Sequence, residues 1–527
     1  INNVNTFTGA TNLNAGTIEL GMDLALGTSP LSITSGADLH FGTLTTATLG
    51  GLNGDGDIVL ENITPDPVAL TLAGGGTHTG ILSGSGSLAL TGGTEQLGGP
   101  STFAGGTTLT GGLLRMAHAT ALGSGTITHD GGALWFSFGD GSTTTVANDI
   151  VLPALGQTNS FYIKGDDGAN ITLPTEVTLT GLITGGAPGE VYRLLDSGQG
   201  GNNNHFVRFT NAANSFEGTI QMWRGNLLFT SDEALGAPEN DIQHVTQNIN
   251  GAITFDAPNL TLNAGRTIDF AAFGADNRPI NTQTYDGTIA GDMIGEAAMR
   301  KQGTGKLTLT GATTFTGSAN VDDGTLALEG SADLGAVTTI STAATGILDV
   351  TAIAPFNTFA DLRGDGTIAG TTVASGNVAP GAADDVIGTL TTGDITLDYT
   401  YDAEIDSTLV QADSLVVNGN LTITSFVTEL QLSDLAPAAV ANGTKFVIAE
   451  YTGSQSGTFE FFDGFGFVTL NDGDTLTSGG IDYVIDYDDT TPGPNKYITL
   501  TVSSAVSPFD SWASGTGGLD GTPGKEA

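Results

Sequence analysis

A segment of 21 residues recurs four times and constrains the fold of this chain more than any other feature. Each copy opens on a phenylalanine, has a glycine nine residues later and closes on a Leu-Gly pair, with no insertion inside the frame. The phenylalanine, central glycine and closing glycine of the copies are Phe7, Gly16 and Gly27; Phe103, Gly112 and Gly123; Phe216, Gly225 and Gly236; and Phe315, Gly324 and Gly335. Such internal self-similarity is the sequence signature of a repeat architecture.

This segment predicts short strands that are joined by tight corners at glycine. Residues 17–20 (Thr-Ile-Glu-Leu) and 325–328 (Thr-Leu-Ala-Leu) alternate between apolar and outward positions with period two. The glycine that precedes each strand can turn a corner with positive φ. A similar glycine-led strand follows about twenty residues later, for example at Gly36 after Gly16. This spacing suits one coil of a β-solenoid, in which each coil stacks on the last.

We divide the chain into a solenoid, a C-terminal region and a tail. The solenoid, residues 1–385, contains four units of roughly 100 residues, which span 1–95, 96–205, 206–300 and 301–385. After Pro380-Gly381 the strands lengthen and become more aromatic. An exposed solenoid end has unpaired backbone groups, so residues 386–505 are predicted to form a β cap. Residues 506–527 form a Gly-rich tail.

The charge balance excludes several classes of partner. The 527 residues include 56 acidic and 14 basic ones, which gives a net charge of −42. Nucleic acid requires a basic patch for its phosphates, so it is not an expected partner, and anionic lipid surfaces are disfavoured. Cysteine is absent, which does not assign a compartment because a long solenoid core needs no disulfide.

The sequence contains no targeting or spanning segment. No run of 18 or more apolar residues occurs, so no membrane span is predicted. The chain begins at Ile1, without Met or a signal peptide and almost directly inside a repeat. We therefore expect a processed or trimmed form of an exported protein.

The recurring segment resembles the autotransporter-associated β-strand repeat, which is found in right-handed β-helical passenger regions of bacterial surface proteins. The matching positions are Phe7, Gly9, Thr11, Leu13, Gly16, Thr17, Ile18 and Leu20, and again Phe315, Gly317, Val321, Gly324, Thr325, Leu326 and Leu328. Residues 377–405 followed by 413–424 resemble the end of such passengers. The resemblance implies an all-β, right-handed parallel β-helix of roughly twenty or more coils with a C-terminal β cap, exported to a bacterial surface. It leaves function open, because such repeats occur in adhesins, enzymes and inert stalks.

Acidic pairs are the candidate Ca²⁺ ligands, since this hard cation takes six to eight oxygens. The candidates are Asp55, Asp57, Asp166, Asp167, Asp384, Asp385, Asp486 and Asp488. They form neither an EF-hand loop nor a Gly-Gly-x-Gly-x-Asp series. With 56 acidic residues, adjacent pairs also arise from composition alone. Solvated corners and a Ca²⁺ site therefore both remain open.

No catalytic residue is predicted. Some β-helices cleave polysaccharides through paired carboxylates across a groove, but spacing alone cannot place two carboxylates face to face. The six histidines have no metal-ligand spacing and no Ser/His/Asp frame. In the third unit Trp223, Phe270, Phe273 and Tyr285 form an aromatic group that either stacks on a sugar or packs its own loops. The integrin-type tripeptide at Arg363 occupies a recurring Gly-x-Gly corner, which explains its glycine structurally.

Two functions of different classes follow. The leading hypothesis is an exported, non-enzymatic structural or adhesin-like protein of a bacterial cell surface. Its solenoid ends and apolar tail would allow self-association into a homopolymer, such as a filament, sheath or surface layer. The alternative is a polysaccharide-binding or polysaccharide-degrading β-helix with surface glycans as partners, which the aromatic group of the third unit favours.

Overall fold

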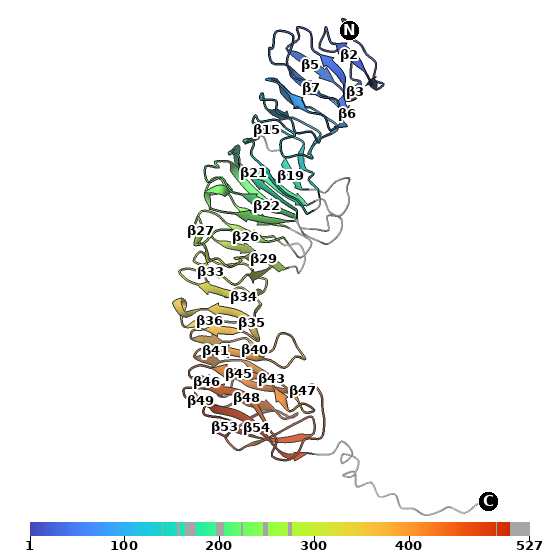
Figure 1. The fold of residues 1–527 in the computed structure, drawn as a ribbon. Helices are drawn as coiled ribbons and strands as arrows, with labels where there is room; N and C mark the ends of the chain where they lie inside the picture. Colours follow the sequence, from blue (N-terminus) through green and yellow to red (C-terminus); the bar gives the residue numbers. More distant parts are fainter. Residues whose placement is uncertain are drawn as a thin grey trace, which may run out of the picture. The chain divides into compact units, whose positions relative to one another are not determined.

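The computed structural model describes residues 1–139, 141–154, 159–163, 175–196, 205–222, 225–245, 251–271, 277–491 and 493–505. Its strands stack in parallel coils and form a β-solenoid of about 17 turns (Figure 1). In the described residues, helix is limited to the 3-10 turns η2 (Glu233–Leu235) and η3 (Thr351–Ile353). The predicted all-β parallel solenoid is therefore confirmed. The chain divides into two compact units, Ile1–Gly317 and Ser318–Ala527.

The number of coils is lower than the roughly twenty or more that we expected. Some coils have the expected length: the hydrogen bond from Ser35 N to Asp55 Oδ1 joins residues 20 apart in sequence. Others are longer, because Ile81 N and Asp57 Oδ1 are 24 apart and Leu182 N and Asp149 Oδ1 are 33 apart. Longer coils and excursions use more residues for each turn, so about 17 turns accommodate the chain.

The first unit consists of short strands. Its first part contains β1 (Thr11–Leu13), β2 (Gly16–Glu19), β3 (Pro30–Ile33), β4 (Ala37–His40), β5 (Thr46–Leu49), β6 (Gly51–Gly54), β7 (Ile58–Val59), β8 (Ala69–Leu72), β9 (Gly76–His78), β10 (Leu82–Ser83), β11 (Ser87–Leu90), β12 (Thr94–Leu97), β13 (Thr107–Leu109), β14 (Leu113–Met116), β15 (Ile127–His129) and β16 (Ala133–Phe136).

The same unit continues with strands of similar length, apart from the long β21. They are β17 (Thr143–Val146), β18 (Ile150–Leu152), β19 (Asn159–Ile163), β20 (Thr175–Leu179), β21 (Ile183–Asp196), β22 (His205–Phe209), β23 (Glu217–Met222), β24 (Asn226–Phe229), β25 (Ile242–His244), β26 (Ile253–Phe255), β27 (Leu260–Leu262), β28 (Ile268–Phe270), β29 (Asn277–Asn281), β30 (Gly287–Ile289), β31 (Met293–Gly295), β32 (Ala298–Gln302) and β33 (Lys306–Leu309).

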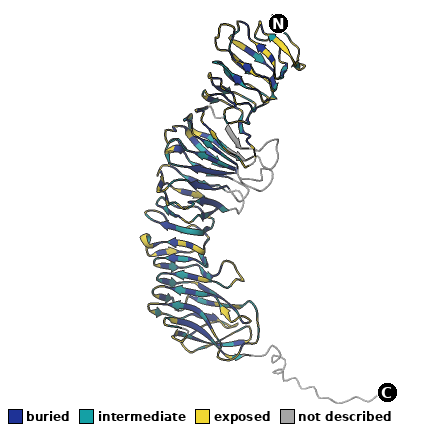
Figure 2. Ribbon diagram, viewed as in Figure 1, coloured by how far each residue is buried: buried dark blue, intermediate teal, exposed yellow. Residues whose placement is uncertain are grey.

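Ladders of identical apolar side chains build the core of the first unit. Leu49 of β5 pairs with Leu72 of β8, and Leu72 pairs in turn with Leu90 of β11. Leu90 then pairs with Leu109 of β13. All four leucines are fully buried, whereas the residue that precedes each leucine on its strand is half-buried. Figure 2 shows this alternation of buried and accessible positions along the strands. A shift of one residue would expose the whole ladder, so the period-two pattern fixes the register.

The strands of the second unit vary in length from two to eleven residues. They are β34 (Ala319–Leu328), β35 (Thr339–Asp349), β36 (Phe356–Thr358), β37 (Asp361–Gly364), β38 (Thr367–Ala369), β39 (Thr372–Ala374), β40 (Asn377–Pro380), β41 (Thr389–Thr392), β42 (Ile395–Leu397), β43 (Thr400–Asp406), β44 (Gln411–Ala412), β45 (Ser414–Val417), β46 (Leu421–Ile423), β47 (Glu429–Asp434), β48 (Lys445–Tyr451), β49 (Gln455–Ser456), β50 (Glu460–Phe462), β51 (Phe467–Thr469), β52 (Thr475–Ser478), β53 (Ile481–Asp489) and β54 (Lys496–Ala505).

The pairing in this unit changes from parallel to antiparallel toward its C-terminal part. Parallel coils continue past residue 385, since β41 pairs in parallel with both β38 and β45. Farther along, β48 and β53 both pair antiparallel with β54, and β50 pairs antiparallel with β51. Among the described residues, antiparallel strand pairs occur only in this unit. The predicted β cap over residues 386–505 stays a prediction.

Candidate functional site

A five-stranded parallel sheet in the second unit forms a flat outer face. The sheet contains β36, β39, β42, β46 and β49. Its central positions lie in register across all five strands and none of them is buried. From strand to strand they are Asn357, Val373, Thr396, Thr422 and Ser456. Small and mostly polar side chains therefore cover this face.

Large aromatic side chains are exposed at one edge of this sheet, where the strands end in corners. Phe359 follows β36 and is 79% exposed, Tyr399 follows β42 and is 58% exposed, and Phe426 follows β46 and is 80% exposed. We call these three residues the aromatic row. Phe and Tyr usually bury much of their surface in a core. Their repeated exposure at equivalent corners is the strongest sign of a binding surface in the described part of the chain.

The corner backbones hold the aromatic row outward. The corner that follows β46 is fixed by hydrogen bonds from Thr428 Oγ1 to Leu397 O (2.7 Å) and from Glu429 N to Tyr399 O (2.8 Å). Phe426 itself has φ of 67°, a left-handed conformation that costs a non-glycine residue free energy. The intervening corner, after β39, contains Gly376, and a Cβ at this position would lie 2.6 Å from the carbonyl oxygen of Phe359. The glycine leaves room between the aromatic corners.

Polar groups lie beside these rings. Ser375 Oγ donates to Asp398 Oδ2 (3.4 Å), and the hydroxyls of Ser425 and Thr458 are 3.3 Å apart. Residues 356–360, 372–376, 395–399 and 421–428 contain no Lys or Arg. Aromatic faces with hydroxyl and carboxylate neighbours can stack on the apolar face of a sugar and hydrogen-bond its hydroxyls, but they cannot neutralise an anion.

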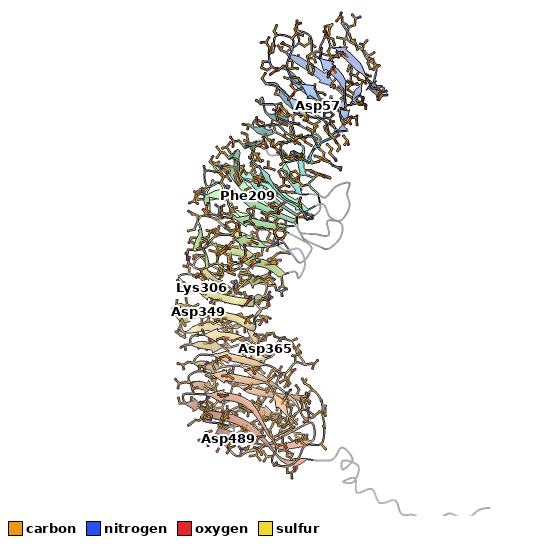
Figure 3. All side chains as sticks on the ribbon, viewed as in Figure 1. Asp57, Phe209, Lys306, Asp349, Asp365 and Asp489 are labelled. Carbon is orange, nitrogen blue, oxygen red and sulfur yellow. The ribbon has the colours of Figure 1, made fainter. Side chains whose placement is uncertain are left out.

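The Ca²⁺ candidates of the first unit act instead as acceptors between coils. Asp55 Oδ1 accepts the Ser35 N–H (2.9 Å), and Asp57 Oδ1 accepts the Ile81 N–H (2.8 Å). Figure 3 labels Asp57. Corner carboxylates and amides bridge coils in the same way elsewhere, as Asp286 does to Lys306 N (2.8 Å). Many acidic residues therefore satisfy backbone N–H groups that parallel pairing leaves open at the corners.

Asp384 and Asp385 belong to a loop over a carboxylate pocket. Arg363 forms an ion pair with Asp384 (3.0 Å), while Glu404 Oε1 accepts the Asp385 N–H (2.8 Å) and Asp413 Oδ1 accepts the Gly388 N–H (2.8 Å). Burial raises the pKa of the Asp413 carboxyl to about 7, although the N–H groups of Gly388 and Glu404 that donate to this carboxylate oppose the rise. The pocket thus fastens a loop to the coil.

The remaining Ca²⁺ candidates are Asp486 with Asp488 and Asp166 with Asp167. Asp486 Oδ1 accepts the Asp488 N–H (3.1 Å), and burial raises the pKa of Asp486. Asp166 and Asp167 lie outside the described residues. In the part of the chain that the structure describes, no group of three or more His, Asp or Glu side chains has the arrangement to hold a metal ion.

The aromatic group that we predicted in the third unit is not a surface platform where it can be described. Phe270 is fully buried and packs edge-on against Phe315, with ring centroids 5.6 Å apart. Tyr285 is half-buried, and Trp223 and Phe273 lie outside the described residues. The alternation of Ile268, Asp269 and Phe270 is the signal that could have identified Phe270 as core.

Paired carboxylates do meet around one open groove, of about 230 Å³, in the first unit. Asp38, His40, Asp57 and Glu61 line it. However, Asp57 accepts the Ile81 N–H and Glu61 Oε1 accepts the Ser85 N–H (2.8 Å). Both carboxylates therefore have structural hydrogen bonds, and the groove carries no argument for catalysis.

Two further sequence features have structural roles. Arg363 of the integrin-type tripeptide pairs with Asp384, and Asp365 Oδ1 accepts the Thr389 N–H (3.1 Å), so both ends of the tripeptide are engaged within the chain. Figure 3 labels Asp365. Four of the six histidines are buried on strands, which agrees with a structural role; they are His78, His129, His205 and His244.

Comparison with known proteins agrees with the fold. The passenger-associated-transport-repeat family matches residues 1–20 and 299–328, which include the first parts of the first and fourth copies of the recurring segment. No curated protein matches the chain. Among the described residues, no helix is long and apolar enough to span a membrane. Such repeats on a β-solenoid fit a secreted or cell-surface bacterial passenger domain and indicate a structural rather than a catalytic protein. These matches are consistent with an autotransporter-associated β-strand repeat protein.

Proposed function

We propose that this chain is a non-enzymatic, adhesin-like structural protein of a bacterial surface, and that it binds a neutral polysaccharide through the aromatic row. The observation that carries the proposal is the exposure of Phe359, Tyr399 and Phe426 at equivalent corners of one sheet. Large exposed aromatic groups beside hydrogen-bonding side chains are typical of ligand sites rather than of inert surface.

The geometry of the coils supports an extended sugar chain as ligand. Strands of successive coils lie about 4.8 Å apart, so the corners of Phe359 and Tyr399 are separated by roughly 10 Å and those of Tyr399 and Phe426 by roughly 5 Å. Each pyranose in an extended β-1,4-linked chain advances the chain by nearly the distance between two successive coils. Successive sugars can therefore follow successive corners. Phe359 and Tyr399 would stack on alternate sugars, and Tyr399 and Phe426 on adjacent sugars.

The charge of the chain selects neutral sugars. The corners carry no basic residue, Asp398 lies beside Tyr399, and the whole chain has a net charge of −42. Uronate or sulfated polymers would be repelled, because no cation is available at these corners to offset their charge. A protein partner fits the aromatic row less well than a polysaccharide does, because polar residues such as Ser375 and Thr424 interrupt the apolar surface.

A binding assay on the full chain tests this function. Affinity electrophoresis or pull-down with neutral β-linked glucans and with uronate polymers should show retention by the neutral ones only. The triple variant Phe359→Ser, Tyr399→Ser, Phe426→Ser should lose at least tenfold in affinity, while Phe465→Ser, which changes an exposed phenylalanine outside the row, should bind like the wild type. Unchanged binding by the triple variant, or no binding of neutral glucans by the wild type, would refute the proposal.

A further inference from the structure

Four neighbouring strands of the first unit align one row of side chains on an outer sheet face. Thr77 of β9 pairs with Gln96 of β12, Gln96 pairs with Arg115 of β14, and Arg115 pairs with Trp135 of β16. We call these four residues the arginine ladder. Thr77 is exposed and the other three are half-buried, whereas both strand neighbours of Gln96, Arg115 and Trp135 are buried. The ladder therefore faces away from the core.

Arg115 and Trp135 are unusual residues for this part of the chain. Residues 1–163 contain no other Lys or Arg and no other tryptophan. The two side chains meet on adjacent coils, with the guanidinium carbon of Arg115 4.7 Å from the centroid of the Trp135 ring. Such stacking holds a guanidinium by cation–π attraction and directs the N–H groups at its edge toward a planar acceptor. The ladder thus presents a positive charge in a fixed orientation.

The charge of Arg115 is not neutralised within the described part of the chain. Arg208 forms an ion pair with Glu176 (2.7 Å), and Arg266 forms one with Asp232 (2.9 Å). Arg115, by contrast, has no carboxylate within ion-pair distance among the described residues, and its Nε has no hydrogen-bond acceptor. An unsatisfied guanidinium needs an explanation in a chain with 56 acidic residues. An anionic group from outside the chain would supply the missing negative charge.

The rest of the ladder suits a sugar better than a free anion. The Gln96 amide and the Thr77 hydroxyl each donate and accept hydrogen bonds, as sugar hydroxyls do. The row of polar side chains continues on the preceding coil, where Asn53 Oδ1 accepts the Thr77 N–H (3.1 Å). Successive coils are about 4.8 Å apart, so the backbones of Thr77 and Trp135 are separated by roughly 14 Å, which is the length of about three sugars.

The number of charges on the ligand follows from the charge balance. One guanidinium matches one carboxylate, because both groups are planar and form paired hydrogen bonds. A polymer with a carboxylate on every sugar would place its other charges near a chain with a net charge of −42, which would repel it. The ligand that fits the ladder is therefore an otherwise neutral oligosaccharide with a single acidic sugar.

We propose that the arginine ladder binds an oligosaccharide that carries a single carboxylate. Arg115 holds the carboxylate, and Gln96 and Thr77 bind hydroxyls of the sugars that follow. The ladder belongs to the first unit and the aromatic row to the second, so this inference does not rest on the proposed function.

Calorimetric titration of the full chain with sialyllactose, which carries one carboxylate, and with lactose, its neutral parent, tests the proposal. The triple variant Phe359→Ser, Tyr399→Ser, Phe426→Ser is the background, so that the aromatic row does not contribute to binding. This background should bind sialyllactose at least tenfold more tightly than lactose. Adding Arg115→Gln should abolish that preference. Adding Lys496→Gln, which removes an exposed cation outside the ladder, should leave it unchanged.

A second variant keeps the test valid if Arg115→Gln disturbs the coil. Gln96→Ala leaves the stack of Arg115 on Trp135 in place and should weaken sialyllactose binding several-fold. Equal affinities for the two sugars in the background, an unchanged preference after Arg115→Gln, or unchanged binding after Gln96→Ala would each overturn the proposal. A preference that falls as much with Lys496→Gln as with Arg115→Gln would indicate a general charge effect and would also overturn it.

Discussion

The first and second copies of the recurring segment share one frame but have different surroundings. In the second copy β13 pairs with β11 and β15, and β14 pairs with β12 and β16, so coils cover it on both sides. In the first copy β1 and β2 pair with β3 and β4 only, as far as the described strands show. Phe103 is accordingly fully buried, whereas Phe7 is 42% exposed.

The backbone path, by contrast, is the same in both copies. The closing glycines Gly27 and Gly123 have φ of 61° and 72°. A methyl group built on either would clash with the carbonyl oxygen of its own Phe7 or Phe103. These two copies thus share the closing turn, while the burial of their side chains depends on neighbouring coils, as expected for a solenoid in which each coil contacts only its neighbours.

Phenylalanine replacement should give the largest difference between the two copies. Phe103→Ala removes a fully buried ring and should cost about 3–5 kcal/mol in the free energy of local unfolding. Phe7→Ala, the matched control, should cost about 0.5 kcal/mol or less. Hydrogen exchange of the coils around β13 and β1 measures each cost locally, because a solenoid need not unfold in one step. Equal costs would show that burial is not set by the stacked coils.

A buried glutamate extends the comparison to pH. Glu95 of β12 is fully buried between Gly76 and Leu114, and its Oε2 accepts the Leu52 N–H (3.2 Å). Burial raises the pKa of Glu95 from 4.5 to about 8. Because the folded state holds this proton more tightly, the stability from Glu95 is complete below pH 4.5 and is lost as the pH rises through about 8.

The expected result is a pH-dependent difference between Glu95→Gln and the wild type. As the pH rises from the unfolded to the folded pKa of Glu95, the free energy of unfolding of the wild type should fall by about 1.4 kcal/mol for each pH unit relative to that of Glu95→Gln. The matched control is Glu19→Gln, at an exposed position of β2 in the first copy, which should follow the wild type. Local exchange of the coils around β12 at pH 5 to 9 measures the difference. Parallel profiles for wild type and Glu95→Gln would contradict it.

The sequence predicts what is local and repeated, and it misses what depends on neighbouring coils. The glycine corners and the alternation after Gly16 predict parallel coils, since both depend on a few adjacent residues. The burial of Glu95 and His129 could not be predicted, because it results from residues of other coils that pack above and below. Coil number was overestimated because insertions such as the 33-residue step at Asp149 have no signature of their own.

The candidate site was missed for a related reason. The sequence of residues 395–405 favours one long strand that would include Tyr399, but the strand breaks there into β42 and β43, and the break exposes the ring. Phe426 in turn occupies a left-handed corner that favours glycine or asparagine. An aromatic residue where other corners carry Gly, Ser or Asn is the signal that could have identified the aromatic row.

Replacing the closing glycines tests the turn with positive φ that the first and second copies share. Gly27→Ala and Gly123→Ala should each cost about 1–2 kcal/mol, because both force a side chain into the left-handed region. Gly335→Ala, in the fourth copy, is the matched control: Gly335 has no positive φ, and its nearest contact would be Asp333 Oδ1 at 3.4 Å. Thermal and exchange measurements should rank Gly335→Ala as the mildest change. A cost at Gly123 but not at Gly27 would mean that neighbouring coils, rather than the segment, impose the turn.

The corner carboxylates should give the smallest effects, and they separate structural acceptors from metal ligands. Asp57→Ala removes the acceptor for the Ile81 N–H and should cost about 1 kcal/mol locally. Asp57→Asn keeps an oxygen in place and should cost less, although it removes the charge that a cation would need. A chelator should then leave the Tm of the wild type unchanged, because Oδ1 of Asp55 and Oδ1 of Asp57 each already accept a backbone N–H. A fall in Tm that Ca²⁺ reverses, and that Asp57→Asn abolishes, would reassign these corners as cation sites.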